Sequence, residues 1–277
     1  MMSMSARLGG GVFGRTLRLE LRRAVYSPRF LLGVGLTLVW MAFNAAEAVG
    51  SYPNAVFAGI PVLLRLAITG QLSTGPVLLA VATIPHAFSY LAERECGFQQ
   101  QAISRVGSVT YARCKSIAIF LSAFLMGAVA IATFIVIASI IGIPHTVRYD
   151  EVEHTYAVLA ATMGPGWYYA IKIFHIGMVC GQAAVFSLLI MTWVPNSYVC
   201  FLSPLIGYYL YECILSILSR FIYNPFFFRL ISGDALFWGQ AAANPLFSYL
   251  WTIYLLSFVT LCYSVCFMIR VEKELAK

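Results

Sequence analysis

The sequence predicts an all-α, polytopic membrane protein with six transmembrane helices. Composition, uncharged stretches and hydropathy pattern are the three observations behind this prediction. Of the 277 residues, 61% are hydrophobic and 10% are charged, whereas soluble domains are about 45–50% apolar and about 25% charged. The composition excludes a soluble enzyme, a disordered chain and a nucleic-acid-binding module. The apolar runs are continuous rather than alternating, which favours helices over a β-barrel. Long stretches without any Asp, Glu, Lys or Arg include 66–92, 116–147, 173–211 and 235–269.

Residues 12–27 precede the first apolar run and predict an N-terminal amphipathic interfacial helix. A basic helix of this kind lies in the headgroup plane and is attracted by anionic lipid, although a generic juxtamembrane anchor fits the pattern equally well. Its apolar face carries Phe13, Leu17, Leu21 and Ala24. Another face carries Arg15, Arg18, Arg22 and Arg29, and Arg23 adds a further positive charge.

The membrane spans follow from length, because a bilayer-crossing helix needs about 20 mostly apolar residues. Ser27-Pro28 fits an N-cap and a first helical position for the first span. The uncharged stretch 173–211 is too long for one crossing, and turn residues at 193–197 divide it into two. The six predicted spans lie at about 30–49, 71–91, 116–141, 168–191, 197–217 and 246–269.

The distribution of Lys and Arg predicts the orientation of these spans. With six crossings, 13 basic residues lie on the side of the termini and five on the opposite side. An excess of Lys and Arg marks the cytoplasmic side. We therefore expect a multi-pass plasma-membrane protein, of the prokaryotic inner-membrane type, with both termini in the cytoplasm.

The cytoplasmic loop 92–115 carries the most informative pattern of polar residues. It extends the second span with Glu93, Arg94 and Glu95, breaks at Gly97 and is interrupted again at Gly107. A short charged helix held between two spans transmits motion from a soluble partner, whereas a solvated connector needs the same residue types. The residue types alone leave these two interpretations open.

Segment 218–245, before the last span, is rich in aromatic residues but interrupted by Pro and Gly. Short helices that dip into the outer leaflet fit this pattern and predict a broken outer hairpin, or re-entrant segment. An ordinary aromatic-rich extracellular loop is the alternative.

No catalytic site is predicted. The chain contains no G-x-x-x-x-G-K-[ST], H-E-x-x-H or G-x-S-x-G motif, so the chain by itself is not expected to be an enzyme. The seven cysteines show no C-x-x-C spacing and are expected to be small buried hydrophobes. No metal site is predicted either: the acidic cluster at 150–154 fits a solvated loop better than a weak metal site. His86 and His175 leave open an axial haem pair, with Met178 one turn below His175.

Two carboxylates, Glu47 and Glu212, lie within or at the edge of apolar spans. An intramembrane carboxylate is costly and is therefore a candidate functional residue. Both residues fall near the outer ends of their spans, where headgroups or water satisfy them, so a structural role stays open. Lys172 is a possible salt-bridge partner for either of them.

The loop 92–115 resembles the loop that follows the second helix in ABC-2 type transporter permeases. That family shows an acidic residue, a nearby Gly, a short coupling helix, and then Tyr and Lys entering the next span. The overall organisation is also similar across most of the chain. One departure is Ser104-Arg105-Val106-Gly107, where family members often carry a Pro-containing turn. The matching residues are Glu93, Glu95, Gly97, Arg105, Tyr111 and Lys115, and Arg94 and Arg113 lie among them.

The resemblance implies a half-transporter that exports a hydrophobic or amphipathic substrate, such as a peptide, a lipid-like molecule or a drug. A second permease, identical or paralogous, would complete the path, and two copies of a separate ATPase would supply ATP and Mg²⁺. No cofactor is expected in this chain itself. Membrane lipid is an expected partner and nucleic acid is not. An ion-gradient-driven transporter or channel and a haem- or quinone-binding membrane subunit are the alternatives.

A substrate path is expected where the permeases meet. Its candidate lining is aromatic, and either of the two intramembrane carboxylates would favour a cationic cargo there. The candidate path residues are Phe43, Glu47, Phe201, Tyr208, Tyr209, Tyr211 and Glu212.

Overall fold

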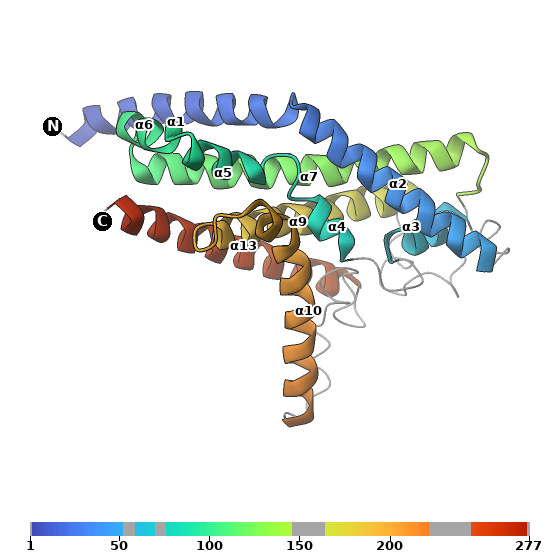
Figure 1. Ribbon diagram of the computed structural model, residues 1–277. Coiled ribbons are helices and arrows are strands. Elements are labelled where there is room, and N and C mark those ends of the chain that lie inside the picture. The colour runs from blue at the N-terminus through green and yellow to red at the C-terminus, as the bar shows by residue number, and fades with distance from the viewer. Residues whose placement is uncertain (1, 52–58, 70–75, 146–163, 222–244, 276–277) are drawn as a thin grey trace.

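The computed structural model describes residues 2–51, 59–69, 76–145, 164–221 and 245–275 of the chain. Every regular element within these ranges is a helix (Figure 1). The helices are α1 (Met2–Val25), α2 (Pro28–Ser51), α3 (Ile60–Thr69), α4 (Val77–Val81), α5 (Ala87–Glu95), α6 (Phe98–Val106), α7 (Ser108–Ile140), α9 (Pro165–Met191), α10 (Ser197–Phe221) and α13 (Pro245–Leu275).

Helix length and composition make this a multi-pass helical membrane protein. Five helices among the described residues are long and apolar enough to cross a bilayer. They coincide with the first, third, fourth, fifth and sixth predicted spans, and the third begins earlier than predicted. The five stretches are Pro28–Ser51, Ser108–Ile140, Gly166–Met191, Ser197–Phe221 and Tyr249–Glu274.

The predicted second span, 71–91, is not one continuous helix in its described part. α4 ends at Val81, a turn occupies 82–86, and α5 begins at Ala87. Pro85 explains the break, because its ring collides with the carbonyl four residues earlier and it has no N–H to donate. Short-range hydrogen bonds satisfy the turn: the Thr83 N–H donates to Ala80 O at 3.1 Å and the Ile84 N–H donates to Val81 O at 3.1 Å.

The path of the chain puts both of its ends at one end of the molecule. In Figure 1, α2 leads away from the end marked N, and α3, α4 and α5 then succeed one another on the way back. α7 leads away again, and α13 returns to the end marked C. The short helices α4 and α5 therefore lie where a single straight second span was predicted.

Several predicted helix boundaries are confirmed. α2 begins at Pro28, and the Phe30 N–H donates to Ser27 Oγ at 3.2 Å, as an N-cap requires. Gly97 (φ 69°) and Gly107 (φ 82°) separate α5 from α6 and α6 from α7. Both glycines have left-handed φ values that other residues rarely adopt. A turn at 192–196 separates α9 from α10.

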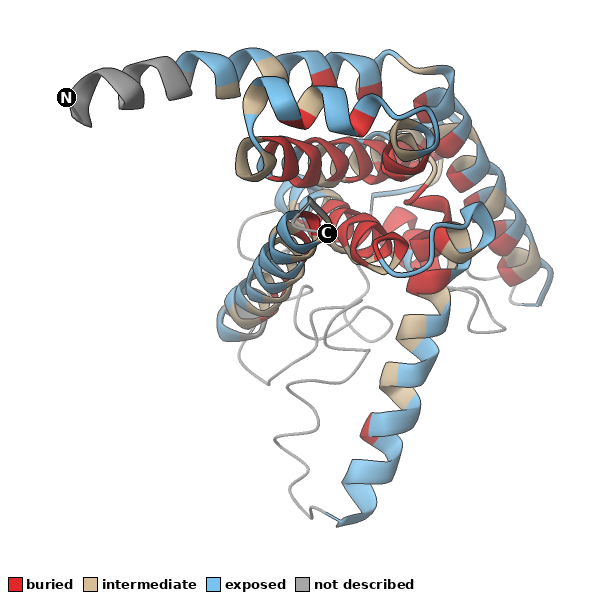
Figure 2. Ribbon diagram, turned by 60° about the vertical axis from the view of Figure 1, so that its left-hand side comes forward, coloured by how far each residue is buried: buried red, intermediate tan, exposed pale blue. Residues whose placement is uncertain are grey.

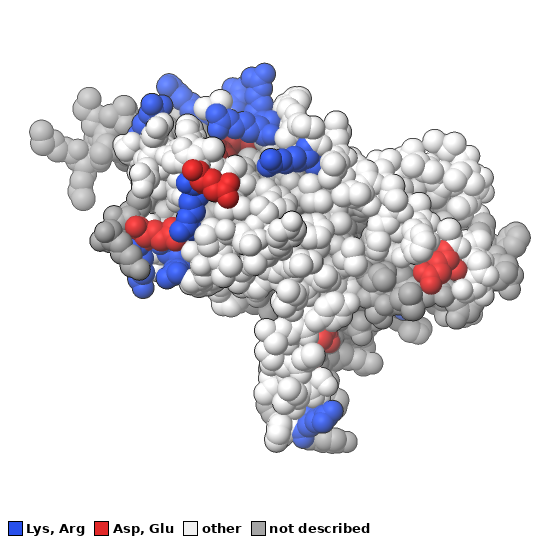
Figure 3. All heavy atoms as spheres, viewed as in Figure 1, with Lys and Arg blue, Asp and Glu red and all other residues white. Residues whose placement is uncertain are grey.

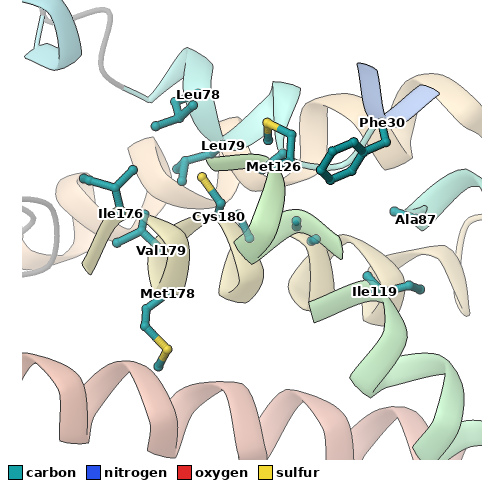
Figure 4. Close-up of a cluster of buried hydrophobic side chains, with 14 of the residues drawn as sticks. Phe30, Leu78, Leu79, Ala87, Ile119, Met126, Ile176, Met178, Val179 and Cys180 are labelled. Carbon is teal, nitrogen blue, oxygen red and sulfur yellow. The ribbon is translucent and has the colours of Figure 1, made fainter. Parts of the chain in front are cut away.

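The core is centred on α7 and α9, which approach closely because of two glycines. A Cβ added at Gly177 would lie 2.8 Å from the ring of Phe124, and one at Gly181 would lie 2.6 Å from the ring of Phe120. Small residues four apart are a frequent means of close helix packing in membranes. Figure 4 shows the apolar cluster that α2, α4 and α7 build around α9, with Met126 beside Phe30.

Burial is uneven across the molecule. Most side chains of α9 and about half of those of α7 are buried, whereas α10 leads away from the other helices and is mostly exposed (Figure 2). Many of the large apolar side chains on α10 are 40% or more exposed, up to 80% at Phe221. The predicted outer segment 218–245 lies outside the described residues except for the last turn of α10 and Pro245, where α13 begins.

Candidate functional site

The first helix packs against the start of α7 through its apolar face. The half-buried or buried positions of α1 are 13, 16, 17, 20, 21, 24 and 25, which confirms the predicted periodicity. Arg15, Arg18, Arg22 and Arg23 are exposed. Both ribbon views show α1 alongside the first part of α7. The predicted position in the headgroup plane stays a prediction; the packing shows α1 following α7 rather than crossing its end.

Glu20 interrupts this apolar face and turns the contact into a charged one. Its side chain is 11% exposed, and Lys115 of α7 is 0% exposed. The Lys115 Nζ donates to Glu20 Oε2 at 3.0 Å and to Glu93 Oε1 of α5 at 2.6 Å. One buried ammonium group therefore links three helices, since burying a charge is tolerated only when it is paired and hydrogen-bonded.

Two neutral groups complete this arrangement. His86, at the start of α5, has Nε2 3.0 Å from Glu20 Oε2, so a ring with its proton on Nε2 donates to the carboxylate. Tyr111 of α7 donates its hydroxyl to Glu93 Oε2 at 2.7 Å. We call Glu20, His86, Glu93, Tyr111 and Lys115 the charge network.

The charge network keeps Glu20 ionised. Burial raises the pKa of Glu20, but the hydrogen bond to His86 and the positive charge of Lys115 outweigh burial and hold the pKa at about 2. Two carboxylates share one ammonium group, so the network carries one formal negative charge while both remain ionised. Its cohesion depends on Lys115.

Further contacts extend from the charge network to α6 and α13. Arg94 of α5 forms a salt bridge with Glu274 of α13 at 3.4 Å. Tyr90 packs edge-on against Phe267 of α13, with ring centroids 5.4 Å apart, and accepts a hydrogen bond from the Gln99 amide at 3.4 Å. The α5–α6 segment is therefore fixed to the first and last long helices as well as to α7.

The outer face of α6 is exposed. Its polar face is exposed, including Arg105, and Phe98 is 39% exposed beneath the guanidinium of Arg23, which lies 5.9 Å from the ring centroid. Glu95, Gly97 and Arg113 are exposed as well. On the face drawn in Figure 3, Lys and Arg gather over α1 and near the chain ends, and the remaining surface is almost uncharged.

The predicted coupling residues thus divide into two groups. Glu93, Tyr111 and Lys115 lie inward, in the charge network, and Arg94 is half-buried in its salt bridge. Glu95, Gly97, Arg105 and Arg113 face outward. Only the second group is placed to touch a docked subunit.

The predicted path residues are not brought together as a group. Tyr208 and Tyr211 line one cavity with α4, α9 and α13. Phe43 and Tyr209 are exposed, at 69% and 49%. The other three, Glu47, Phe201 and Glu212, are half-buried and do not line that cavity. Lys172 and His175 are buried on α9.

The structure bears differently on the acidic-cluster metal site and on the haem pair. The acidic cluster at 150–154 lies outside the described residues. Within the part of the chain that is described, no three His, Cys, Asp or Glu side chains converge as a metal site. The Nε2 atom of His86 is engaged by Glu20, so haem ligation through that atom requires the charge network to open.

Sequence reasoning missed Glu20 and the structural role of His86. The signal for Glu20 was present, because it is the one acidic residue in a strongly basic helix and it falls on the apolar face. Its partners lie 66 and 95 residues further along the chain, which no local pattern reveals.

Comparison with protein-family models, with curated proteins and with solved structures found no match to this chain.

Proposed function

We propose that this chain is the membrane-spanning permease subunit of an ATP-driven transporter of the ABC-2 type. A separate ATPase docks on the outer face of α6, and both termini lie on the ATPase side, in the cytoplasm. A second permease completes the translocation unit. The cargo is hydrophobic or amphipathic and moves outward.

The observation that carries this proposal is the attachment of the short α5–α6 segment to several long helices at once. Lys115 joins it to α7 and α1, and the Arg94–Glu274 salt bridge joins it to α13. A push on α6 is therefore delivered to those helices instead of being absorbed by a flexible loop. A solvated connector needs no buried ammonium group at its base.

The attachment also shows which residues test coupling cleanly. Glu93 holds buried Lys115, so Glu93→Ala combines a folding defect with any coupling defect. Glu95→Ala and Arg105→Ala remove exposed charges and leave the charge network intact. Lys273→Ala, at an exposed position on α13, is the matched control for charge loss at the same end of the molecule.

The first experiment is purification of the tagged chain from its native host in a gentle detergent, with mass spectrometry of the associated proteins. A stoichiometric ABC-type ATPase is the expected result, reduced by Arg105→Ala and Glu95→Ala but not by Lys273→Ala. The same sample shows whether the second permease is identical or paralogous. Repeated purification of the chain without any ATPase overturns the proposal.

An ion-gradient-driven transporter is the second candidate, favoured by the interrupted helix at 82–86. Discontinuous helices near mid-membrane form substrate and ion sites in many secondary transporters. Flux into proteoliposomes driven by a proton or sodium gradient, without ATP, distinguishes this candidate from the first.

A further inference from the structure

We propose that the cavity between α4, α9, α10 and α13 is a binding site for a compact lipophilic molecule of about two rings that carries one hydrogen-bonding group. The cavity has a volume of about 330 Å³. Its apolar lining includes Leu79, Val179, Ala183 and Leu256, and its polar groups are Gln182 and three tyrosines. Ligand sites commonly combine such an apolar lining with a few polar groups that orient the ligand.

The cavity volume sets the size of the ligand. An apolar protein cavity of about 150 Å³ binds benzene, so a cavity of 330 Å³ accommodates roughly twice that molecule. Two fused rings, or an aliphatic body of similar bulk, fit this volume. A whole phospholipid and a peptide of several residues do not.

The polar lining sets the chemistry of the ligand. Tyr208 and Tyr211 come from α10, Tyr263 from α13 and Gln182 from α9. Hydroxyl and amide groups both donate and accept hydrogen bonds, and no Asp, Glu, Lys or Arg lines the cavity. An uncharged ligand with a hydroxyl, carbonyl or amide is therefore favoured over an ion.

One wall of the cavity is fixed by close packing. Phe186 packs against Tyr263, with ring centroids 5.2 Å apart, and a Cβ added at Gly207 would lie 2.8 Å from the Phe186 ring. The glycine lets the ring approach α10 closely, and both residues line the cavity. A side chain at position 207 would push the ring toward the cavity.

The cavity also gives the proposed transporter a candidate cargo class, and only that cargo assignment rests on the proposed function. Binding itself requires neither ATP nor an ATPase. Failure of binding therefore leaves the ATPase association untouched, and failure to find an ATPase leaves the binding site standing.

The test is binding of 2-naphthol to the full chain in lipid nanodiscs, measured by the saturable rise in unfolding temperature and by equilibrium dialysis. Ala183→Leu fills the cavity and is expected to abolish saturable binding. Tyr208→Phe and Tyr211→Phe remove hydroxyls from the lining, and at least one of them is expected to weaken binding about 3- to 10-fold, the usual effect of one hydrogen bond. Tyr209→Phe changes an exposed neighbour on α10 and is expected to have no effect.

Two controls keep the outcome decisive. Naphthalene, which lacks the hydroxyl, is expected to bind less tightly than 2-naphthol to the unchanged chain. If Ala183→Leu does not fold, Val259→Phe fills the same cavity from α13. A non-saturable response that is equal in the unchanged chain and in every variant reports partition into the bilayer and overturns the proposal.

Discussion

The charge network and the cavity region are built on opposite physical principles. The first joins α1, α5 and α7 through buried ionic groups with short, directional contacts. The second lies among α4, α9, α10 and α13, has no ionised side chain in its lining and contains open space. Ionic groups in a poorly solvated site are held in one geometry, because each lost contact leaves a charge uncompensated. Apolar side chains that line a cavity can adopt several arrangements, since dispersion contacts have little directional preference.

This difference suits the two tasks of the proposed permease. The segment that receives force must keep its geometry while it moves as a unit. The segment that meets cargo must accept a molecule and release it. Four predictions test the contrast, from the largest expected effect to the smallest.

Lys115→Met is expected to be the most damaging change, because it removes the ammonium group that Glu20 and Glu93 share. Arg23, which lies 3.7 Å from Glu20, is 60% exposed and cannot replace a buried cation. Breaking a buried pair on one side costs about 3–5 kcal/mol of folding free energy. Chemical unfolding in nanodiscs measures the loss, and exposed Arg113→Met is the matched control. Adding Glu20→Gln and Glu93→Gln to Lys115→Met should recover much of the loss; no recovery would show that charge is not the cause.

Replacement of two closely packed glycines by alanine should lower the folding free energy by unequal amounts. Gly181→Ala places a Cβ 2.6 Å from the Phe120 ring in the tight α7–α9 contact and is expected to cost about 1–3 kcal/mol of folding free energy through overpacking. Gly207→Ala meets the Phe186 ring, which has the cavity to move into, so its cost should be smaller. Gly166→Ala, where a Cβ meets nothing within 4 Å, is the control. Equal costs at 181 and 207 would contradict the contrast.

The pH dependence of the free energy of unfolding should reveal the protonation of Glu20. Its pKa is about 2 in the folded chain against an ordinary value of 4.5, so the unfolded chain takes up the proton first as the pH falls. The stability that this carboxylate contributes is then fully present above about pH 4.5 and is lost as the pH falls toward 2. The stability difference between the unchanged chain and Glu20→Gln is expected to follow this course. A difference that stays constant down to pH 2 would exclude an ionic role for Glu20.

The smallest effect is expected at the partly exposed Arg94–Glu274 salt bridge. Pairs of this kind contribute about 0.2–1 kcal/mol and weaken with added salt. A double-mutant cycle with Arg94→Ala and Glu274→Ala measures the coupling between the two side chains. If this coupling free energy equals the one between Lys115 and Glu93, burial does not make the ion pairs of the charge network stronger than exposed ones.

Local sequence signals predicted many features of the fold. Proline and glycine act on their own backbone, so Ser27-Pro28, Gly97 and Gly107 marked helix boundaries that the structure reproduces. The same logic should have broken the predicted span 71–91 at Pro85, where apolar composition outweighed the proline in the prediction. Composition reports how much of a segment is apolar, but not whether its backbone is continuous.

The residues of the site were only partly predictable. Glu93, Tyr111 and Lys115 were identified together because the loop 92–115 that contains them resembles a family pattern, in which they lie close together in sequence. Their inward orientation was not foreseen, and neither were Glu20 and His86, which belong to other helices. Of the aromatic path residues, only Tyr208 and Tyr211 line the cavity, since the lining also depends on α4, α9 and α13.

The sequence by itself determined that this chain is a helical membrane protein, where several of its long helices begin, and that α1 is amphipathic. These properties follow from hydrophobicity and backbone stereochemistry, which act over a few residues. The tertiary structure decided which buried carboxylates share Lys115 and where helices leave a cavity. Those outcomes depend on contacts between residues far apart in the chain, such as Glu20 and Lys115, which are 95 positions apart, and the free energy of such contacts exists only once the helices have packed.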